Sequence, residues 1–384
     1  MKILIATGIY PPDIGGPATI LEALSYSLKE KGLSVQIITY SNIKKHNNDR
    51  EEVFRIVKNK FFSRWQYLWK MFRLSRQADL IYVTDTYSVG YFAYLIKKMT
   101  GKKYIVRFAG DGAWEMAVAS GWTQDYIVDF QDKVYNDQIE RLKKRRQKIL
   151  VNANRIIAVS NFIAMIAEKI GVDKDRIKVI YNSIDFIKDN VVQLDKVEEI
   201  KKQYGQDAEI IVTACRLTRW KGVDGIIKSL PQIKQKIGNV NFLVLGDGPE
   251  MDNLKHLANE FNVADSVHFL GRIRHDEIIN YFKAADLFVL NTNYEGLSHT
   301  LLEAIKAAVP IITTNIGGNP EVIENHRNGL LIGYNNIEEL KNAAIKILSD
   351  EQFADNLVNN AKLTLKKFNW ENTINETVKL LKEV

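Results

Sequence analysis

The sequence contains a single cysteine, Cys215, so it cannot form an internal disulfide framework. That scarcity is expected of a protein kept in a reducing cytoplasm. No apolar run reaches the roughly 18 residues that a membrane-spanning helix needs. The opening segment, residues 1–16, carries one lysine and a short apolar run that stops at Pro11-Pro12, which predicts a first β-strand rather than a signal peptide.

Familiar metal and nucleoside-triphosphate motifs are also missing. The six histidines are scattered, and no two of them are spaced as ligands on one helix face would be. Asp173 and Asp175 form a pair of carboxylates two positions apart. They lie between a predicted helix and a predicted strand, where a solvated turn is expected. There is no Walker lysine motif and no Ser/His/Asp grouping. We therefore expect neither a metal nor a cofactor.

The composition is that of a soluble globular protein, with 46% hydrophobic and 26% charged residues. A chain of 384 residues exceeds what one compact core usually serves, so two domains are expected. The net charge of +7 indicates an anionic partner. Nucleotide phosphates, anionic lipid and nucleic acid all qualify.

Short apolar runs alternate with amphipathic stretches along the chain, which predicts two parallel α/β sheets. The polar stretch 185–206 lacks strand character and predicts a linker, after which the pattern restarts. The predicted strands are 2–7, 35–40, 80–84, 104–108, 155–159 and 177–181 in the first half, and 210–214, 241–245, 267–270, 287–291 and 311–314 in the second. The predicted helices are 18–30, 88–98, 162–170, 223–236, 250–261, 276–284 and 300–308.

The strongest motif is NYEGLSHTLLEA, residues 293–304, where a strand ends, a glycine turn follows and a helix begins. Ser298 or Thr300 can cap that helix, and the free N–H groups at its start favour a phosphate. Glu303 lies farther along in an apolar stretch, so its carboxylate needs a partner, and sugar hydroxyls are good donors to it. Taken singly, Glu295 and Glu303 would be a loop charge and a helix-face charge; paired around a helix start, they favour function.

A second motif, CRLTRWKG, also runs from a strand end into a helix. Arg216 offers a forked set of donors and Lys221 a mobile point charge, and together they could hold a diphosphate and stabilise it as it leaves. The alternative is a basic turn paired to surface carboxylates. Weaker turns follow other strands at Gly246-Asp-Gly248, Gly317-Gly318 and Gly15-Gly16, and the first of these lacks the third glycine of a dinucleotide fingerprint.

These residues resemble the retaining glycosyltransferases of family 4, which have the GT-B fold. The resemblance covers nearly the whole chain, and its specificity lies in the joint order and spacing of pieces that are weak alone. The matching residues are Gly15-Gly16 after Pro11-Pro12, Ser160, Asn182, Asp185, Arg216, Lys221-Gly222, Gly246-Asp-Gly-Pro, Glu295, Glu303, Gly317-Gly318-x-Pro-Glu321 and Trp370.

The resemblance implies an α/β protein of two doubly wound, Rossmann-like domains that face each other across a cleft. The last helix, after Trp370, would cross back onto the first domain. The acceptor-side domain would then be residues 1–186 plus 369–384, and the nucleotide-sugar donor-binding domain would be residues 187–368.

The resemblance also implies catalytic roles. Glu295 would hold the donor sugar hydroxyls near the reacting carbon, while Arg216 and Lys221 would bind the diphosphate and help it leave. The anomeric configuration would be kept without a metal, and the departing phosphate oxygen would take the acceptor proton without a protein nucleophile.

This chain departs from the family's usual sequence at two places near the expected reaction centre. Many members have Glu-Gly-Phe-Gly where this chain has Glu295-Gly-Leu-Ser298, and the polar first-domain residue at the reacting carbon is often His, where the candidate here is Asp111. A plain helix cap is the competing role for Asp111.

Donor-binding roles are implied in the same way. Glu303 would hold the ribose hydroxyls, Gly16 would approach the donor from the first domain, and the backbone near Arg272 and Ile273 would face the base. The other implied donor-binding residues are Gly246, Gly296, Leu297, Ser298 and His299.

The implied partners are a nucleotide-sugar donor and a sugar, glycan or lipid-linked acceptor, with no nucleic acid. The function would lie in glycan, polysaccharide or glycolipid assembly. A nucleotide-sugar epimerase, a sugar-phosphate-utilising synthase and a catalytically silent nucleotide-sugar-binding protein stay open as alternatives. An NAD dehydrogenase is disfavoured because neither half carries the full glycine fingerprint.

Residues 58–76 contain six basic residues and no acidic one. Helical spacing places Phe61, Trp65, Leu68 and Phe72 on one stripe, the composition of an interfacial helix with aromatic anchors beside a basic face. A second basic run, residues 141–148, adds charge to the same domain. We therefore expect a cytoplasmic enzyme that binds the inner face of an anionic membrane peripherally. The alternative is that the stripe packs on the sheet of the first domain and the basic run is solvated.

Overall fold

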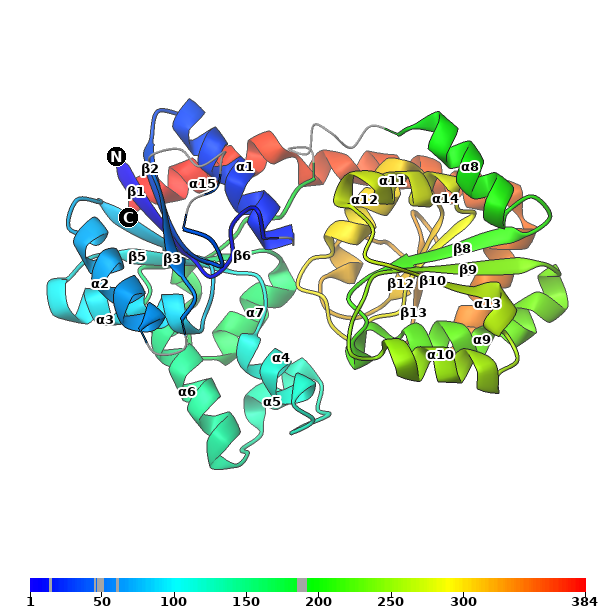
Figure 1. Cartoon of the computed structure of the whole chain (residues 1–384), viewed down its shortest axis with the longest axis horizontal. Coiled ribbons are helices and arrows are strands. Elements are labelled where there is room, and N and C mark those ends of the chain that lie inside the picture. The colour runs from blue at the N-terminus through cyan, green and yellow to red at the C-terminus, as the bar shows by residue number, and fades with distance from the viewer. Residues whose placement is uncertain (14–15, 45, 47–51, 60–61, 185–191) are drawn as a thin grey trace. The chain divides into compact units, whose positions relative to one another are not determined.

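The computed structural model describes residues 1–13, 16–44, 46, 52–59, 62–184 and 192–384. The chain divides into two compact units, Met1–Asn182 with Trp370–Val384, and Ser183–Asn369. Each unit is built on a parallel sheet, as the sequence predicts (Figure 1).

The first unit has a seven-stranded sheet in the order β3-β2-β1-β4-β5-β6-β7. Its strands are mostly buried runs of Ile, Val and Leu, as expected of parallel strands covered on both faces. The strands are β1 Lys2–Thr7, β2 Ser34–Ser41, β3 Val53–Val57, β4 Leu80–Val83, β5 Tyr104–Phe108, β6 Arg155–Ala158 and β7 Ile177–Val179. The helices are α1 Gly16–Glu30, α2 Ser63–Ser75, α3 Ser88–Thr100, α4 Gly112–Ala119, α5 Ile127–Asp132, α6 Asp137–Val151, α7 Asn161–Lys169 and α15 Trp370–Glu383.

The C-terminal helix α15 belongs to this first unit. Its apolar face, with Ile374 and Leu381, joins the cluster that contains Ile3 and Ile5 of β1. At the start of the helix, Trp370 Nε1 donates to Ser27 Oγ of α1 at 3.1 Å. The last residues of the chain therefore cover one face of the sheet that its first residues begin.

The second unit has a six-stranded sheet in the order β10-β9-β8-β11-β12-β13. Helices α9, α10 and α13 pack together in one layer and α8, α11, α12 and α14 in another, so both faces are covered (Figure 1). The strands are β8 Glu209–Ala214, β9 Val240–Leu245, β10 Val267–Gly271, β11 Leu287–Leu290, β12 Ile311–Thr314 and β13 Leu330–Ile332. The helices are α8 Leu194–Tyr204, α9 Val223–Ile237, α10 Met251–Glu260, α11 His275–Ala284, α12 His299–Ala307, α13 Ile337–Ser349 and α14 Glu351–Thr364.

The linker predicted at residues 185–206 is wrong over half of its length. Residues 194–204 form α8, which buries Val197 and Ile200 and packs against α11. Apolar residues three positions apart lie on the same face of a helix, so a mostly charged helix can still pack that face against a neighbouring helix. The start of the predicted linker, 185–191, lies outside the described residues.

Each sheet reverses its strand order at one place, between β1 and β4 in the first unit and between β8 and β11 in the second. Loops diverge there at the carboxyl ends of the strands, which is where open α/β sheets bind ligands. Among the described residues, no helix is both long and apolar enough to cross a membrane.

Candidate active site

The carboxyl ends of β8 and β11 bring two of the predicted catalytic residues together. Lys221, in the loop after β8, forms an ion pair with Glu295, in the loop after β11. The two side chains are only 16% and 17% exposed, so each charge depends on the other in a place with little water. Residues 74 positions apart in sequence thus meet at the switch point of the second sheet.

Arg216 lies at the same edge but is exposed. Among the described residues its guanidinium has no ion-pair or side-chain hydrogen-bond partner, whereas the neighbouring Arg219 pairs with Glu250 at 3.2 Å. A guanidinium without a protein carboxylate keeps its donors for an anion from solution. At the sheet edge that carries the Lys221–Glu295 pair, Arg216 is therefore a cation with no carboxylate partner in the part of the chain that the structure describes.

Helix α12 begins directly after the Glu295 loop. Ser298 is its N-cap, and its Oγ accepts a hydrogen bond from the backbone N–H of Leu301 at 3.3 Å. Of the two caps that the sequence left open, Ser298 and Thr300, the structure uses Ser298. The remaining N–H groups and the positive end of the helix, at His299, face the loop that carries Gly296 and Leu297, which makes this end suited to a phosphate.

The Glu295 loop is held from the next strand by two glycines. Gly318 N donates to the backbone oxygen of Glu295 at 2.9 Å. Gly317 has φ +64°, and a Cβ there would meet the Glu295 oxygen at 2.3 Å. A larger residue at Gly317 would therefore push the Glu295 loop away.

Gly246, directly after β9, also brings two loops close together. Its N–H donates to the oxygen of Gly271 at 2.7 Å, and a Cβ at its φ of +135° would lie 1.9 Å from the oxygen of Cys215. The loop after β9 thus touches both the start of the Arg216 loop and the loop that leads from β10 to Ile273. Ile273 is half-buried in that last loop, next to the exposed Arg272.

Glu303 faces α11. Its Oε1 lies 2.9 Å from Nε2 of His275, the first residue of that helix, and the Glu303 side chain is 8% exposed. The hydrogen bond to Glu303 raises the pKa of His275, and burial opposes this effect. The sequence predicted that Glu303 needs a partner but did not identify His275, because the pair joins two helices and no spacing along the chain encodes it.

The sequence indicated only that Cys215, the single cysteine, cannot form an internal disulfide. In the structure Cys215 lies between the end of β8 and Arg216. Burial raises the pKa of its thiol to about 11, and nearby Lys221 lowers it by less than burial raises it. The thiol therefore stays protonated at neutral pH and is a poor nucleophile. Among the described residues, no three His, Cys, Asp or Glu side chains are grouped so as to hold a metal ion.

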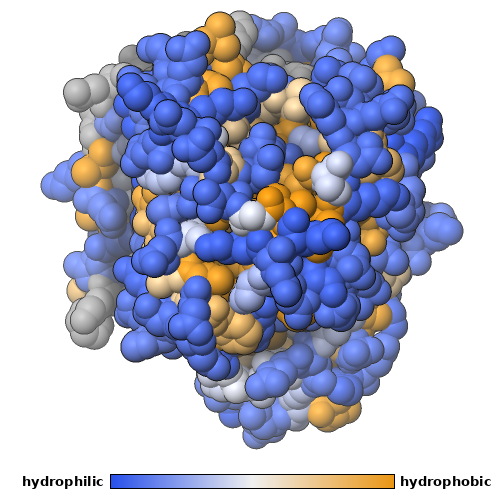
Figure 2. Space-filling model, turned by 90° about the vertical axis from the view of Figure 1, so that its right-hand side faces the viewer, coloured by the Kyte–Doolittle hydropathy of each residue, from blue (hydrophilic) through white to orange (hydrophobic). Residues whose placement is uncertain are grey.

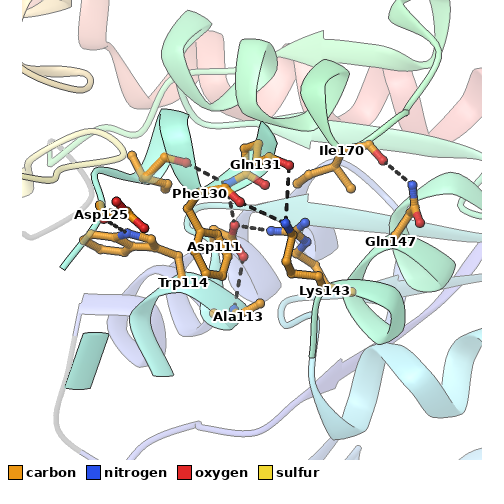
Figure 3. A network of polar contacts seen from close by, with 12 residues as sticks. Asp111, Ala113, Trp114, Asp125, Phe130, Gln131, Lys143, Gln147 and Ile170 are labelled. Atoms are coloured by element: carbon orange, nitrogen blue, oxygen red, sulfur yellow. Dashed lines mark hydrogen bonds and ion pairs between the residues drawn. The ribbon is translucent and has the colours of Figure 1, made fainter. Parts of the chain in front are cut away.

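In the first unit, Asp111 follows β5 and is fully buried. Its Oδ1 accepts from the N–H of Ala113 at 3.0 Å, which caps α4, and its Oδ2 accepts from Gln131 at 3.0 Å and pairs with Arg146 of α6 (Figure 3). The helix cap, the competing role for Asp111, is present in the structure. The role at the reacting carbon stays a prediction, as does the role of Gly16, which opens α1; Gly15 lies outside the described residues.

Asp85 is a further polar group that the sequence analysis did not single out. It follows β4, beside the switch point of the first sheet, and Oδ1 accepts from the N–H groups of Tyr87 at 2.9 Å and Gly90 at 3.4 Å. Burial raises the pKa of its carboxyl group. Its position one residue after the predicted strand 80–84 is the signal that could have found it.

Two family models match the chain: Glycosyltransferase Family 4 over residues 14–187 and Glycosyl transferases group 1 over residues 196–364. An uncharacterised glycosyltransferase of Methanocaldococcus jannaschii is 26% identical over 100% of this chain and 98% of its own length. The N-acetyl-alpha-D-glucosaminyl L-malate synthase of Bacillus anthracis is 24% identical over 94% of this chain and 92% of its own.

Solved structures agree in fold. Anabaena HepE in complex with UDP and glucose superposes with a TM-score of 0.80 at 18% identity, over 100% of both chains. WaaG, a glycosyltransferase involved in lipopolysaccharide biosynthesis, has a TM-score of 0.75 at 17% identity, over 98% of this chain and 99% of its own. With both halves matched by glycosyltransferase models and two Rossmann-like sheets, the chain belongs to the group 1, family 4 glycosyltransferases of the GT-B fold.

Proposed function

We propose that this glycosyltransferase moves a sugar from a nucleotide-diphosphate-sugar to an acceptor hydroxyl in glycan, polysaccharide or glycolipid assembly, with retention of anomeric configuration. The observation that carries the proposal is the Lys221–Glu295 ion pair at the sheet edge where Arg216 also lies, whose guanidinium has no ion-pair partner among the described residues. One edge of one sheet thereby offers two cations for a diphosphate and a carboxylate for sugar hydroxyls.

The donor would lie along this edge of the second unit. Arg216, Lys221 and the start of α12 would hold the diphosphate, and Glu295 the sugar hydroxyls. Glu303 would accept from the ribose hydroxyls, and the backbone at Ile273 would face the base. The HepE structure in complex with UDP and glucose supports a nucleotide-sugar donor.

In the transfer, the bond between the anomeric carbon and the diphosphate oxygen breaks, and a bond to the acceptor oxygen forms on the same face of the sugar. The acceptor proton passes to the departing phosphate oxygen. Arg216 and Lys221 stabilise the charge that grows on the diphosphate, the part a metal plays in other transferases. No protein nucleophile is needed, and the protonated Cys215 thiol and the ion-paired Glu295 are both poor candidates for one.

The first test is a thermal-shift screen of UDP-, GDP- and ADP-sugars, since a ligand of the native state raises the melting temperature with its affinity. The donor that binds is then assayed with simple sugars and lipid-linked sugars as acceptors, and NMR of the product reports its anomeric configuration. Inversion would refute the retaining mechanism. Turnover of the donor without an acceptor would favour an epimerase, and loss of activity with EDTA that magnesium or manganese restores would refute metal independence.

We also propose that helix α2 binds an anionic membrane surface. Trp65 and Trp69 of this helix and its N-cap residue Phe62 are 72%, 59% and 64% exposed, whereas Tyr67 and Met71 are buried. Three exposed aromatic side chains on successive turns resemble the anchors of an interfacial helix. On the face that Figure 2 shows, hydrophilic residues cover most of the surface and hydrophobic ones emerge in patches between them.

The structure changes which residues would make that contact. Of the stripe predicted from the sequence, Trp65 is exposed, Leu68 and Phe72 are half-buried, and Phe61 lies outside the described residues. Tyr67 points inward because its hydroxyl donates to backbone oxygens of β1 and β2. The basic side chains that stay exposed are Arg64 and Arg73 of α2 and Arg76, the C-cap residue that follows it.

The second basic run, residues 141–148, offers less charge than its sequence suggests. Arg146 is buried against Asp111, and Lys143 donates to the backbone oxygens of Phe130 and Lys133 (Figure 3). Only part of this run is therefore free to face lipid headgroups. Helix α2 is the better candidate for the contact.

Cosedimentation with vesicles of rising phosphatidylglycerol content tests this surface. We expect binding that grows with lipid charge and weakens with salt. The double variant Trp65→Ala/Trp69→Ala should lose most of it. Met99→Ala is the control, because Met99 is 70% exposed in the same unit but lies on α3. Binding that ignores lipid charge, or equal losses in both variants, would rule out α2 as the membrane contact.

A further inference from the structure

Glu303 is a buried carboxylate with one oxygen occupied. Oε1 lies 2.9 Å from His275 Nε2, while Oε2 has no hydrogen-bond partner among the described residues. A carboxylate that is nine-tenths buried needs compensation for the water it has lost. His275 supplies that compensation on one side only, which leaves Oε2 to accept from a ligand.

His275 is suited to hold Glu303 in one orientation. It is the first residue of α11, directly after the loop with Ile273, and α11 packs against α12, which carries Glu303. The charged groups that face it are Glu303 on α12 and Asp276 on its own helix. On the α8 side of α11, the Glu277 carboxylate pairs with Lys196 at 3.0 Å.

We propose that His275 is a positioning residue of the donor site, which fixes Oε1 of Glu303 so that Oε2 accepts hydrogen bonds from the donor ribose. This inference rests on the proposed function, in which Glu303 binds the ribose hydroxyls. A glutamate side chain has several rotatable bonds, and a partner that holds it in its bound orientation removes ordering that the ligand would otherwise have to impose. Because the same loop carries Ile273, the base and the ribose would be located by one short segment, residues 272–275.

The experiment compares nucleoside diphosphates that differ only in their ribose hydroxyls. Isothermal titration measures the affinities of UDP, GDP and ADP and of their 2′,3′-dideoxy counterparts for the full-length protein. Hydrogen bonds to a charged group are worth about tenfold or more in affinity, so the wild type should prefer the ribonucleotide by at least that factor. This preference ratio isolates the ribose contact from general binding.

We expect His275→Ala to reduce the preference several-fold and His275→Gln, which keeps a side-chain donor, to retain more of it. His256→Gln should leave it unchanged, because His256 is an exposed residue of α10. Circular dichroism and melting temperature confirm that each variant is folded. A merely structural role would weaken ribo- and dideoxynucleotides equally and leave the ratio at its wild-type value.

Glu303→Gln separates the two levels of the proposal. If this variant keeps the wild-type preference, Glu303 does not bind the ribose and that part of the proposed function fails, together with the role of His275. If Glu303→Gln loses the preference but folded His275→Ala keeps it, the ribose site stands and only the positioning role is overturned. Loss in both variants, with partial recovery in His275→Gln, supports the inference.

Discussion

Lys221 and Glu295 neutralise each other across the loops after β8 and β11, in the same place where a nucleotide-sugar would need both of them. A mostly buried charge that loses its partner is costly. A ligand that binds only Lys221 or only Glu295 would leave the other charge unpaired and would therefore bind poorly. A diphosphate-sugar offers an anion to the lysine and hydroxyl donors to the carboxylate. The ion pair therefore favours ligands that carry both groups.

Glu295→Gln should lower turnover more than donor binding. Glutamine keeps the shape and an acceptor oxygen but removes the charge near the reacting carbon, which should raise the barrier by about 2–4 kcal/mol. Steady-state kcat and KM with the donor found in the nucleotide-sugar screen measure the split. Glu250→Gln is the matched control, since Glu250 pairs with the exposed Arg219 and accepts a hydrogen bond from Asn253 rather than pairing with Lys221. Near-normal kcat in Glu295→Gln would exclude the residue from the chemistry.

Arg216→Ala should weaken diphosphates and leave nucleosides nearly unaffected. The exposed guanidinium contributes through a charged hydrogen bond to phosphate, worth about 1.5–3 kcal/mol. Titration with UDP and uridine, or with the pair of the preferred base, gives the difference directly. Arg219→Ala removes another exposed arginine, three residues away, that is already paired with Glu250, so it should change neither affinity. Equal losses for nucleoside and diphosphate would indicate distortion of the loop instead.

Much of this site was accessible from the chain, because strand ends in a parallel sheet share an edge. Arg216, Lys221 and Glu295 each follow a strand that the alternating pattern predicts, and Ser298 follows a turn typical of a helix start. The parts of the site that the sequence did not predict depend on contacts between helices. His275 meets Glu303 only because α11 packs on α12.

Other errors have similar physical causes. Strands β3, Val53–Val57, and β13, Leu330–Ile332, are missing from the predicted strands, and both lie at the edge of their sheets, where β3 is only partly buried. Helix α2 was expected to expose a stripe that its packing partly buries, because the Tyr67 hydroxyl finds two backbone acceptors in the core. Side-chain hydrogen bonds of this kind select which face of an aromatic-rich helix turns inward.

The His275–Glu303 pair should make stability depend on pH. The pKa of His275 is raised in the folded protein, so its contribution is fully present below the unfolded value near 6.5 and is lost as pH rises through the folded value. His275 is 41% exposed, and solvent screening keeps the effect below about 1 kcal/mol. The difference in melting temperature between wild type and His275→Gln should therefore be larger at pH 6 than at pH 9. A difference that grows with pH would contradict the pairing.

Asp111→Asn should act mainly on stability. The variant keeps an oxygen that can cap α4 but leaves Arg146, which is 4% exposed, without its carboxylate. Breaking a buried ion pair from one side typically costs about 3–5 kcal/mol, a large part of the stability of a normal domain. Urea unfolding of the full-length protein measures this loss.

A double variant then decides between the two roles of Asp111. Asp111→Asn combined with Arg146→Met removes both charges, so neither one is left buried without its partner. If Asp111 serves the fold, the double variant should regain most of the lost stability, and its activity should return with it. If Asp111 acts at the reacting carbon, the double variant should fold and bind donor yet stay inactive, since no change at Arg146 can replace the carboxylate. Full burial of Asp111 and its bonds to Ala113, Gln131 and Arg146 lead us to expect the first outcome.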